Sequence, residues 1–236
     1  NPVREGYLFA GYEPEIPEVM TDDIINAKAV WEPCDDTPYT VIAHYTDFSS
    51  GEVVENTAEY KYAGVTETIV KIVEEMPVYP DENTTYILLE SFEFEYNVFD
   101  YSAANIFETV IIPDGSGIIE LYFRPATYNV IFNANGGKFD DGTSVKSVEA
   151  SHGTLAIDIV PAGKLYKYGF TFSRWSNLDE TTGIEGEVVF NAEWQINVHT
   201  LTLIVDGNEY KEDYEFGSII NSEVVPEKIG HNFVRW

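Results

Sequence analysis

Three segments of the chain follow a period of two, with β-branched and aromatic residues recurring on alternate positions. They are 39–45, 128–133 and 199–205. This alternation predicts half-buried β-strands, because successive side chains of a strand point to opposite faces. Each is followed by a turn signal: Ser49-Ser50-Gly51, Asn135-Gly136-Gly137 or Asp206-Gly207. The strand-like segment Asn208-Glu209-Tyr210-Lys211 follows the last turn, so we expect each module to open with a hairpin.

A closing strand precedes each opening strand, at 27–31, 119–124 and 189–194. Module boundaries are therefore expected near residues 33–38, 125–127 and 195–199. The predicted parts are the C-terminal remnant of a module (1–33), two complete modules (38–125 and 127–195) and the N-terminal part of a further module (198–236). Because the linkers are only a few residues long, we expect modules arranged end to end as a semi-rigid rod.

One short sequence motif, called the repeated phrase below, occurs three times, at 4–12, 167–175 and 228–236. Each copy reads basic residue, any residue, Gly, ring, any residue, Phe, any residue, Gly or Arg, then Tyr or Trp. Repetition at this scale indicates an array of small modules. One copy stands at the N-terminus and another ends the chain, so we expect this sequence to be a slice through a longer array.

The repeated rings have two interpretations. They are Phe9, Phe172 and Phe233, with Tyr12, Trp175 and Trp236. They could form a platform on which sugars stack, or the core of each module. The core is favoured, because a repeating module must repeat its core but need not repeat a ligand site.

Module 38–125 diverges from the others. It lacks the repeated phrase, and its nearest equivalent is Ser91-Phe92-Glu93-Phe94-Glu95-Tyr96. Segment 66–76 fits a helix with one apolar face or a strand followed by a bend, and periodicity leaves both open. Alternation predicts that Glu93 and Glu95 share one face of a strand, roughly 7 Å apart. Paired carboxylates can hydrolyse glycosides, but a solvent-facing side of the sheet is the favoured interpretation.

Composition limits the possible partners. The 236 residues include 13 Lys and Arg against 41 Asp and Glu, a net charge of −28, which would repel nucleic acids and anionic membranes. With 44% hydrophobic and 14% aromatic residues, the chain is expected to fold. No run of 18 apolar residues is present, so no membrane insertion is expected in this segment, and any signal or anchor would lie outside it.

No catalytic, cofactor or metal site is predicted. The single Cys34 excludes an internal disulfide and a cysteine-based metal cluster. His44, His152, His199 and His231 lack zinc-site spacing. Asp35-Asp36 and Asp140-Asp141-Gly142-Thr143-Ser144 offer oxygen ligands for calcium but lack the EF-hand pattern, and the Asp-Gly pair is first a turn signal. Asn135-Gly136-Gly137 lacks the continuation of a phosphate-binding loop.

The stretch from Tyr128-Asn129-Val130-Ile131-Phe132 through Gly169 to Ala192-Glu193-Trp194 resembles the Listeria-Bacteroides repeat, the B-repeat of internalin-type surface proteins. The stretch 203–236 and the remnant, through Pro17-Glu18-Val19-Met20 and Ala29-Val30-Trp31, resemble the same class. Module 38–125 is similar to MucBP-type repeats, notably in Pro113-Asp114-Gly115-Ser116-Gly117. The resemblance implies a mostly β (α+β) fold of tandem ubiquitin-like β-grasp modules.

The resemblance also implies a role outside the cell, at the surface or wall of a Gram-positive bacterium or a gut anaerobe, and no catalysis. No ligand-binding residue carries over from these families. We expect a non-catalytic region that acts as a stalk, an adhesin for host or environmental glycoproteins or polysaccharides, or both. The alternative is a carbohydrate-binding accessory region of a large secreted glycan-degrading enzyme.

Overall fold

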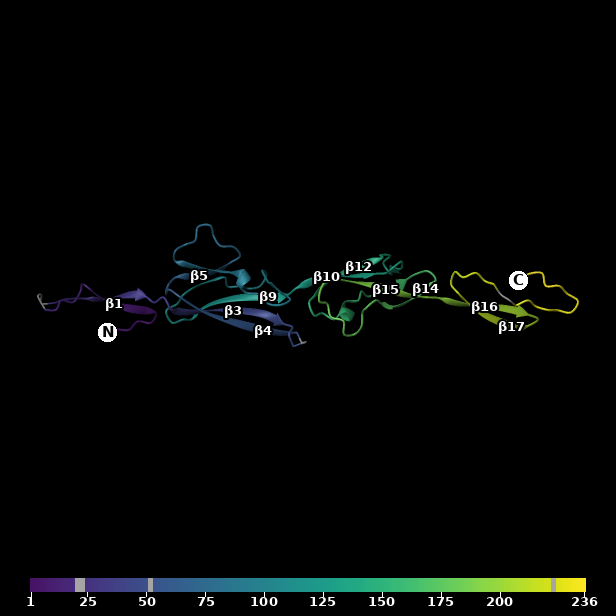
Figure 1. Cartoon of the computed structure of the whole chain (residues 1–236), viewed down its shortest axis with the longest axis horizontal. Helices are drawn as coiled ribbons and strands as arrows, with labels where there is room; N and C mark the ends of the chain where they lie inside the picture. The colour runs from purple at the N-terminus through teal and green to yellow at the C-terminus, as the bar shows by residue number, and fades with distance from the viewer. Residues whose placement is uncertain (20–23, 51–52, 222–223) are drawn as a thin grey trace. The chain divides into compact units, whose positions relative to one another are not determined.

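The computed structural model describes residues 1–19, 24–50, 53–221 and 224–236. The chain divides into two compact units, Asn1–Ala126 and Thr127–Trp236 (Figure 1). The described residues form seventeen strands and two short 3₁₀ turns, η1 and η2, and contain no α-helix. The predicted mostly β, multi-module fold is confirmed.

The first unit begins with a two-stranded hairpin of β1 (Tyr7–Glu13) and β2 (Lys28–Pro33). A four-stranded sheet follows in the order β4-β3-β9-β7, in which β3 and β9 are parallel neighbours. Its strands are β3 (Thr37–Asp47), β4 (Val54–Gly64), β7 (Asn97–Phe99) and β9 (Gly117–Pro125). A smaller sheet has the order β6-β5-β8, from β5 (Ile69–Val73), β6 (Thr84–Leu88) and β8 (Glu108–Val110). Segment 66–76 therefore contains a strand rather than a helix.

The second unit repeats the four-stranded arrangement in the order β12-β10-β15-β14, again with a parallel central pair, β10 and β15. Its strands are β10 (Thr127–Asn133), β12 (Val145–Ser151), β14 (Phe170–Trp175) and β15 (Val188–Ile196). A short ladder joins β11 (Lys138–Phe139) to β13 (Leu165–Tyr166). The unit ends with the hairpin of β16 (Val198–Val205) and β17 (Asn208–Glu215).

The two sheets agree beyond strand order. In each, the first and last strands of the module are parallel at the centre, as in a β-grasp sheet, and the crossovers use 3₁₀ turns, η1 (Leu89–Ser91) and η2 (Ala156–Ile159). In both modules, a backbone hydrogen bond anchors the segment that follows the first hairpin. Glu67 N–H donates to Ile111 C=O (2.9 Å) in the first module, and Gly153 N–H donates to Ile184 C=O (2.8 Å) in the second. The divergent module 38–125 thus has the backbone plan of its neighbour.

The three alternating segments form strands, as predicted. Segments 39–45, 128–133 and 199–205 fall within β3, β10 and β16, and the closing segments lie largely in β2, β9 and β15. Gly51 of the first turn signal and Met20 of the remnant's motif lie outside the described residues. The predicted module boundaries remain predictions.

Each unit has its own apolar core. In the first, Tyr39, Val41, Ile111, Ile119 and Leu121 are buried. In the second, Phe132, Phe190 and Trp175 pack together, with Trp175 only 6% exposed and ring centroids 5.1 Å apart for Phe132 and Trp175. Phe172 is half-buried against this core. The core interpretation of the repeated rings therefore holds for the middle copy of the phrase.

Two predictions for module 38–125 are wrong. Glu93 and Glu95 do not lie on a strand, because residues 92–96 form a loop after η1. The structural equivalent of the repeated phrase is not 91–96 but the segment from Phe94 to Phe99. Asn97 N–H donates to Phe94 C=O (3.1 Å), and Tyr96, with φ 58°, takes the place of the repeated glycine. The conformation of residues 92–96 follows from ring contacts rather than from alternation. Phe92 is buried, and the Phe94 ring stacks on that of Tyr45, with centroids 4.0 Å apart.

Candidate functional site

The repeated phrase opens with the same turn in all three copies. The backbone N–H of the ring residue donates to the C=O of the basic residue: Tyr7 to Arg4 (3.2 Å), Phe170 to Lys167 (3.0 Å) and His231 to Lys228 (3.0 Å). The glycine between them has a positive φ each time, 74° at Gly6, 80° at Gly169 and 75° at Gly230. Only glycine adopts this conformation readily, so the turn explains the fixed glycine.

The rings of the phrase form one cluster per copy. Phe172 and Trp175 are 5.4 Å apart, and Phe9 and Tyr12 are 5.0 Å apart. In a regular strand, residues three apart point to opposite faces, but both copies contain a register shift that places them together. In the first two copies, a tryptophan of the neighbouring strand completes the cluster: Trp31 lies 5.6 Å from Phe9, and Trp194 lies 5.9 Å from Phe172.

The turn of the first copy is joined to module 38–125 through Cys34, the first residue after β2. Its N–H donates to Gly6 C=O (2.9 Å), and its own C=O accepts from Thr66 N–H (2.9 Å). The Thr66 hydroxyl, on a residue only 1% exposed, donates to Gly6 C=O (2.7 Å) and is 2.7 Å from the Thr37 hydroxyl. We call this arrangement of a turn glycine, a linker residue and a hydrogen-bond donor from the next module a joint.

The second copy builds the same joint with different side chains. Asn197 N–H donates to Gly169 C=O (2.9 Å), and Asn197 C=O accepts from Phe216 N–H (2.7 Å). Thr171 and Asn197 add a side-chain hydrogen bond of 2.7 Å. The Phe216 ring packs edge-on to Tyr168 (4.8 Å) and covers Gly169, where a Cβ atom would overlap the ring. Cys34 follows Gly6 at the same spacing as Asn197 follows Gly169.

Half of this joint also occurs in module 38–125, where Ala126 N–H donates to Tyr96 C=O (2.8 Å). The sequence patterns missed the joints, because their contacts join residues far apart in the chain. The available signal was the equal spacing from the repeated glycine to the residue directly after the closing strand, Cys34 after β2 and Asn197 after β15.

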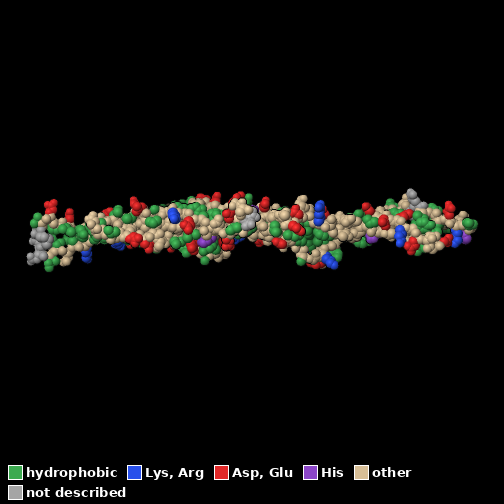
Figure 2. Space-filling model, turned by 90° about the horizontal axis from the view of Figure 1, so that it is seen from below, with side chains coloured by type: hydrophobic (Ala, Val, Ile, Leu, Met, Phe, Trp, Pro, Cys, Tyr) green, Lys and Arg blue, Asp and Glu red, His purple; other side chains and the backbone are tan. Residues whose placement is uncertain are grey.

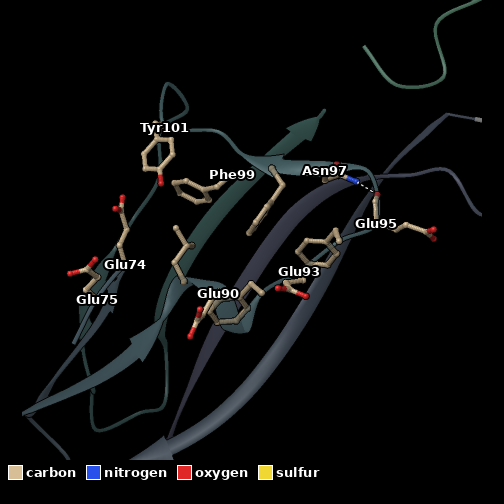
Figure 3. Close-up of a pocket in the computed structure, with 12 residues that line it drawn as sticks. Glu74, Glu75, Glu90, Glu93, Glu95, Asn97, Phe99 and Tyr101 are labelled. Carbon is tan, nitrogen blue, oxygen red and sulfur yellow. Dashed lines mark hydrogen bonds between the residues drawn. The ribbon is translucent and has the colours of Figure 1, made fainter. Parts of the chain in front are cut away.

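The first unit also contains an open groove of about 880 Å³ between η1, β7 and the end of β5 (Figure 3). Its floor is aromatic, with Phe94 5.0 Å and Phe99 5.3 Å from Phe123. Five carboxylates lie around it: Glu74, Glu75, Glu90, Glu93 and Glu95.

Two polar side chains at the groove are fixed by hydrogen bonds. The Tyr101 hydroxyl bonds to Glu74, which raises the pKa of that phenol, and Figure 3 shows the two groups facing each other. The Asn97 amide donates to Glu95 C=O (2.8 Å) and Thr46 C=O (2.8 Å), which braces β7 against β3. Rings beside hydrogen-bond acceptors suit a sugar or a cation.

The histidines lie on separate elements. The His44 ring stacks on Tyr122, with centroids 4.3 Å apart. His152 is 8% exposed, and its Nδ1 is 3.5 Å from the Tyr128 hydroxyl. His199 lies on β16, and His231 lies in the turn of the last copy of the phrase. Within the described ranges, no group of three or more His, Cys, Asp or Glu side chains could hold a metal ion.

Asp141, one of the oxygen ligands considered for calcium, stabilises a turn instead. Asp141 accepts from Thr143 through its backbone N–H (2.9 Å) and hydroxyl (2.6 Å) and pairs with Lys146 (3.0 Å). These interactions lower the pKa of Asp141 to about 2. Asn135 braces the adjacent hairpin, with its amide donating to Ala192 C=O (3.0 Å). The Cys34 thiol is free and half-buried, and it is the Cys34 backbone that takes part in the joint.

Outside the groove, acidic side chains are scattered over the face seen in Figure 2, with few Lys and Arg among them. Such a surface is well solvated and repels other polyanions.

Comparison with known proteins agrees with part of the sequence interpretation. Residues 128–203 match the Listeria-Bacteroides repeat domain family, which confirms the expected repeat in this stretch. Across 260 aligned residues, the chain is 26% identical to a protein of Evansella cellulosilytica described as a Gly-rich membrane protein. A second protein of that organism, described as a membrane protein, is 30% identical over 119 residues.

These relatives are much longer than the chain. The first alignment covers 99% of the chain but 26% of the relative, and the second covers 46% of the chain and 17% of the relative. In the part of the chain that the structure describes, no helix has the length and apolar character needed to cross a bilayer.

Proposed function

We propose that this chain is a non-catalytic repeat region of a bacterial cell-surface or secreted protein and acts as a stalk. The observation that carries the proposal is the joint, built once around Gly6, Cys34 and Thr66 and again around Gly169, Asn197 and Phe216. The match to a Listeria-Bacteroides repeat and the likeness to two bacterial membrane proteins support a surface location.

The joints argue for a stalk because they remove the freedom of the linker. A flexible linker leaves its backbone groups to water, whereas Cys34 and Asn197 each use both the N–H and the C=O in bonds to the two flanking segments. Bending at either joint would break those bonds. The net charge of −28 would keep such a region soluble and would repel other polyanions at a cell surface.

The assignment of module 38–125 as a MucBP-like repeat is part of this proposal. It rests on the resemblance of Pro113-Asp114-Gly115-Ser116-Gly117, which forms a turn in which Gly115 (φ 77°) lies against Pro38 and Asp114 accepts from Ser116 N–H (2.9 Å). The same turn supports the first joint, since a Cβ atom on Gly6 would lie 2.7 Å from Pro113 Cα.

The stalk proposal is tested by the relative motion of the segments on either side of Asn197. Residual dipolar couplings and ¹⁵N relaxation should give one alignment and one tumbling time for β14–β15 and β16–β17. In Gly169→Val, where the new side chain displaces Phe216, the hairpin should reorient independently. If the unsubstituted chain already shows two independent tumbling times, the joint does not restrict bending and the proposal fails.

A second role, adhesion to host or environmental glycoproteins or polysaccharides, is favoured by the groove of Figure 3. Tyr101 is 68% exposed beside the aromatic floor, and its hydroxyl is oriented by Glu74. An oriented ring beside carboxylates is a common way to hold a sugar face and its hydroxyls. Repetition of such modules would strengthen weak contacts through effective concentration.

Adhesion is tested with mucin-type glycoproteins and plant polysaccharides. Tyr101→Ala should lower binding at least tenfold, whereas Tyr79→Ala, at an equally aromatic position that is 92% exposed and outside the groove, should leave it unchanged. Binding unaffected by both changes would exclude the groove. Preference for polysaccharides, with a catalytic domain elsewhere in the full-length protein, would favour an accessory region of a glycan-degrading enzyme.

A further inference from the structure

The groove of Figure 3, here called the acidic groove, has a counterpart in the second unit at the same place in the module. The counterpart has a volume of about 800 Å³ and is lined by residues of the middle copy of the repeated phrase, from Lys167 to Phe172. The acidic groove is lined by residues of the equivalent segment, from Phe94 to Phe99. The two modules therefore present one concavity with different side chains.

The two grooves carry opposite charges. The counterpart is lined by the basic residues Lys164 and Lys167, among others. The lining of the acidic groove includes five carboxylates, all of them exposed: Glu74, Glu75, Glu90, Glu93 and Glu95. In the described part of the chain, no ion pair joins any of these five to a basic side chain. Because the same backbone plan carries either sign, the fold does not impose the charge, and the charge indicates what each groove accepts.

In the counterpart groove, a cation of the protein itself lies over aromatic rings. The Lys167 ammonium is 4.7 Å from the ring centroid of Phe170 and 5.7 Å from that of Trp194. In module 38–125, Phe123 takes the place of Trp194 and Phe94 takes the place of Lys167. The acidic groove thus has a ring where its counterpart has a cation. Since the face of a ring attracts cations, a cationic ligand would supply the interaction that Lys167 makes in the second unit.

We propose that the ligand of the acidic groove is a polysaccharide of amino sugars whose amines are free and positively charged. This inference rests on the adhesion role proposed above and names the class of polysaccharide. Each sugar ring would stack on the aromatic floor, while its ammonium group would lie within reach of the carboxylates at the rim. The exposed Tyr101 ring, oriented by its hydrogen bond to Glu74, would add a further stacking surface.

A basic peptide offers the same charge but suits this groove less well. The carboxylates are exposed, so each ion pair with a ligand would contribute little. A lysine side chain loses much of its rotamer freedom when it is held in place, whereas an amino sugar carries its amine on a rigid ring. Figure 3 shows Glu74 and Glu75 at one end of the groove and Glu95 at the other. Carboxylates spread in this way match a ligand with one charge on each successive ring.

The test compares two oligosaccharides that differ in charge, a tetramer of glucosamine and the same tetramer with N-acetylated amines. In mildly acidic buffer of low ionic strength, the charged tetramer should bind the full chain more tightly by about tenfold or more, as measured by calorimetry. The difference should shrink as salt is added, because exposed charges are screened. In NMR spectra, the charged tetramer should shift the amides of residues 90–95 and 99–101 rather than those of 164–170.

A pair of double variants locates the effect at the rim. Glu90→Gln combined with Glu93→Gln should remove most of the preference for the charged tetramer, because two rim charges are lost. Glu59→Gln combined with Glu82→Gln is the matched control. It removes two exposed carboxylates of the same unit outside the groove and should leave the preference unchanged.

Failure of this inference is distinct from failure of the adhesion role. Equal binding of both tetramers, weakened alike by Tyr101→Ala, would leave a sugar-binding groove that does not select charge, and the inference would be wrong. If neither tetramer binds, and mucin-type glycoproteins and plant polysaccharides do not bind either, both the inference and the adhesion role are wrong. Tighter binding of tetralysine than of the charged tetramer would identify a basic peptide as the occupant and would also overturn the inference.

Discussion

The ring of Phe216 lies directly on Gly169, in the space that any side chain at Gly169 would need. Gly230 has an equivalent turn, with φ 75° against 80°, and open space around it. The two glycines thus share one conformational demand and differ only in what covers them.

This difference predicts unequal effects of one substitution. Gly169→Ala and Gly230→Ala both place a side chain at positive φ, at a cost of about 1 kcal/mol. Gly169→Ala must also displace Phe216, which should add about 1–3 kcal/mol. Urea unfolding followed through the β16–β17 hairpin measures both, and equal losses would contradict the joint.

Trp175 should dominate the stability of the second module. It is 6% exposed and packs on Phe132 and Phe139, with centroids 5.1 and 6.1 Å away. Trp175→Ala should cost about 3–5 kcal/mol, enough to unfold a small module. Calorimetry of the full chain checks this, with Tyr79→Ala as an exposed control that should change stability by less than about 0.5 kcal/mol. A small loss for Trp175→Ala would return the rings to the sugar-platform interpretation.

The strands and turns were predictable because their causes are local. Alternation located β3, β10 and β16, and the signals Asn135-Gly136 and Asp206-Gly207 located turns whose residues have a positive φ. The choice between helix and strand for segment 66–76 could not be made, since its apolar residues fit either periodicity. Glu93 and Glu95 were misplaced because Phe94 stacks on the distant Tyr45, and such a contact has no trace in the neighbouring sequence.

The joints and the groove could not be predicted for the same reason. Thr66 gives no local sign that it will bond to Gly6, and the same position is Phe216 in the last hairpin. The backbone hydrogen bonds are the same in the two joints but the side chains differ, so a search for repeated residues does not find the joints. The groove depends on Glu74 and Tyr101, which come from segments that meet only through the sheets.

Thr66 should hold the first joint through its hydroxyl. It donates to Gly6 C=O and therefore accepts from Thr37, whose residue is 3% exposed. Thr66→Val keeps the shape but leaves the Thr37 hydroxyl buried without this partner, which should cost about 1–3 kcal/mol. Thr57→Val, on the exposed face of β4, is the control and should be neutral. Faster amide exchange at Cys34 in Thr66→Val alone would locate the loss at the joint.

Acid should weaken the turn at Asp141 in a defined pH window. Hydrogen bonds from Thr143, and then the ion pair with Lys146, lower the pKa of Asp141 from 3.8 to about 2. Because the folded pKa is below the unfolded one, the carboxylate contributes stability that is complete above pH 3.8 and is lost as the pH falls toward 2. Carboxyl ¹³C shifts should therefore give Asp141 a midpoint near 2, and Thr143→Ala should raise it. Thr181→Ala, which removes the equivalent hydroxyl bond to Asp179, should leave the Asp141 midpoint unchanged. A midpoint near 3.8 in the unsubstituted chain would show that the turn does not hold the carboxylate.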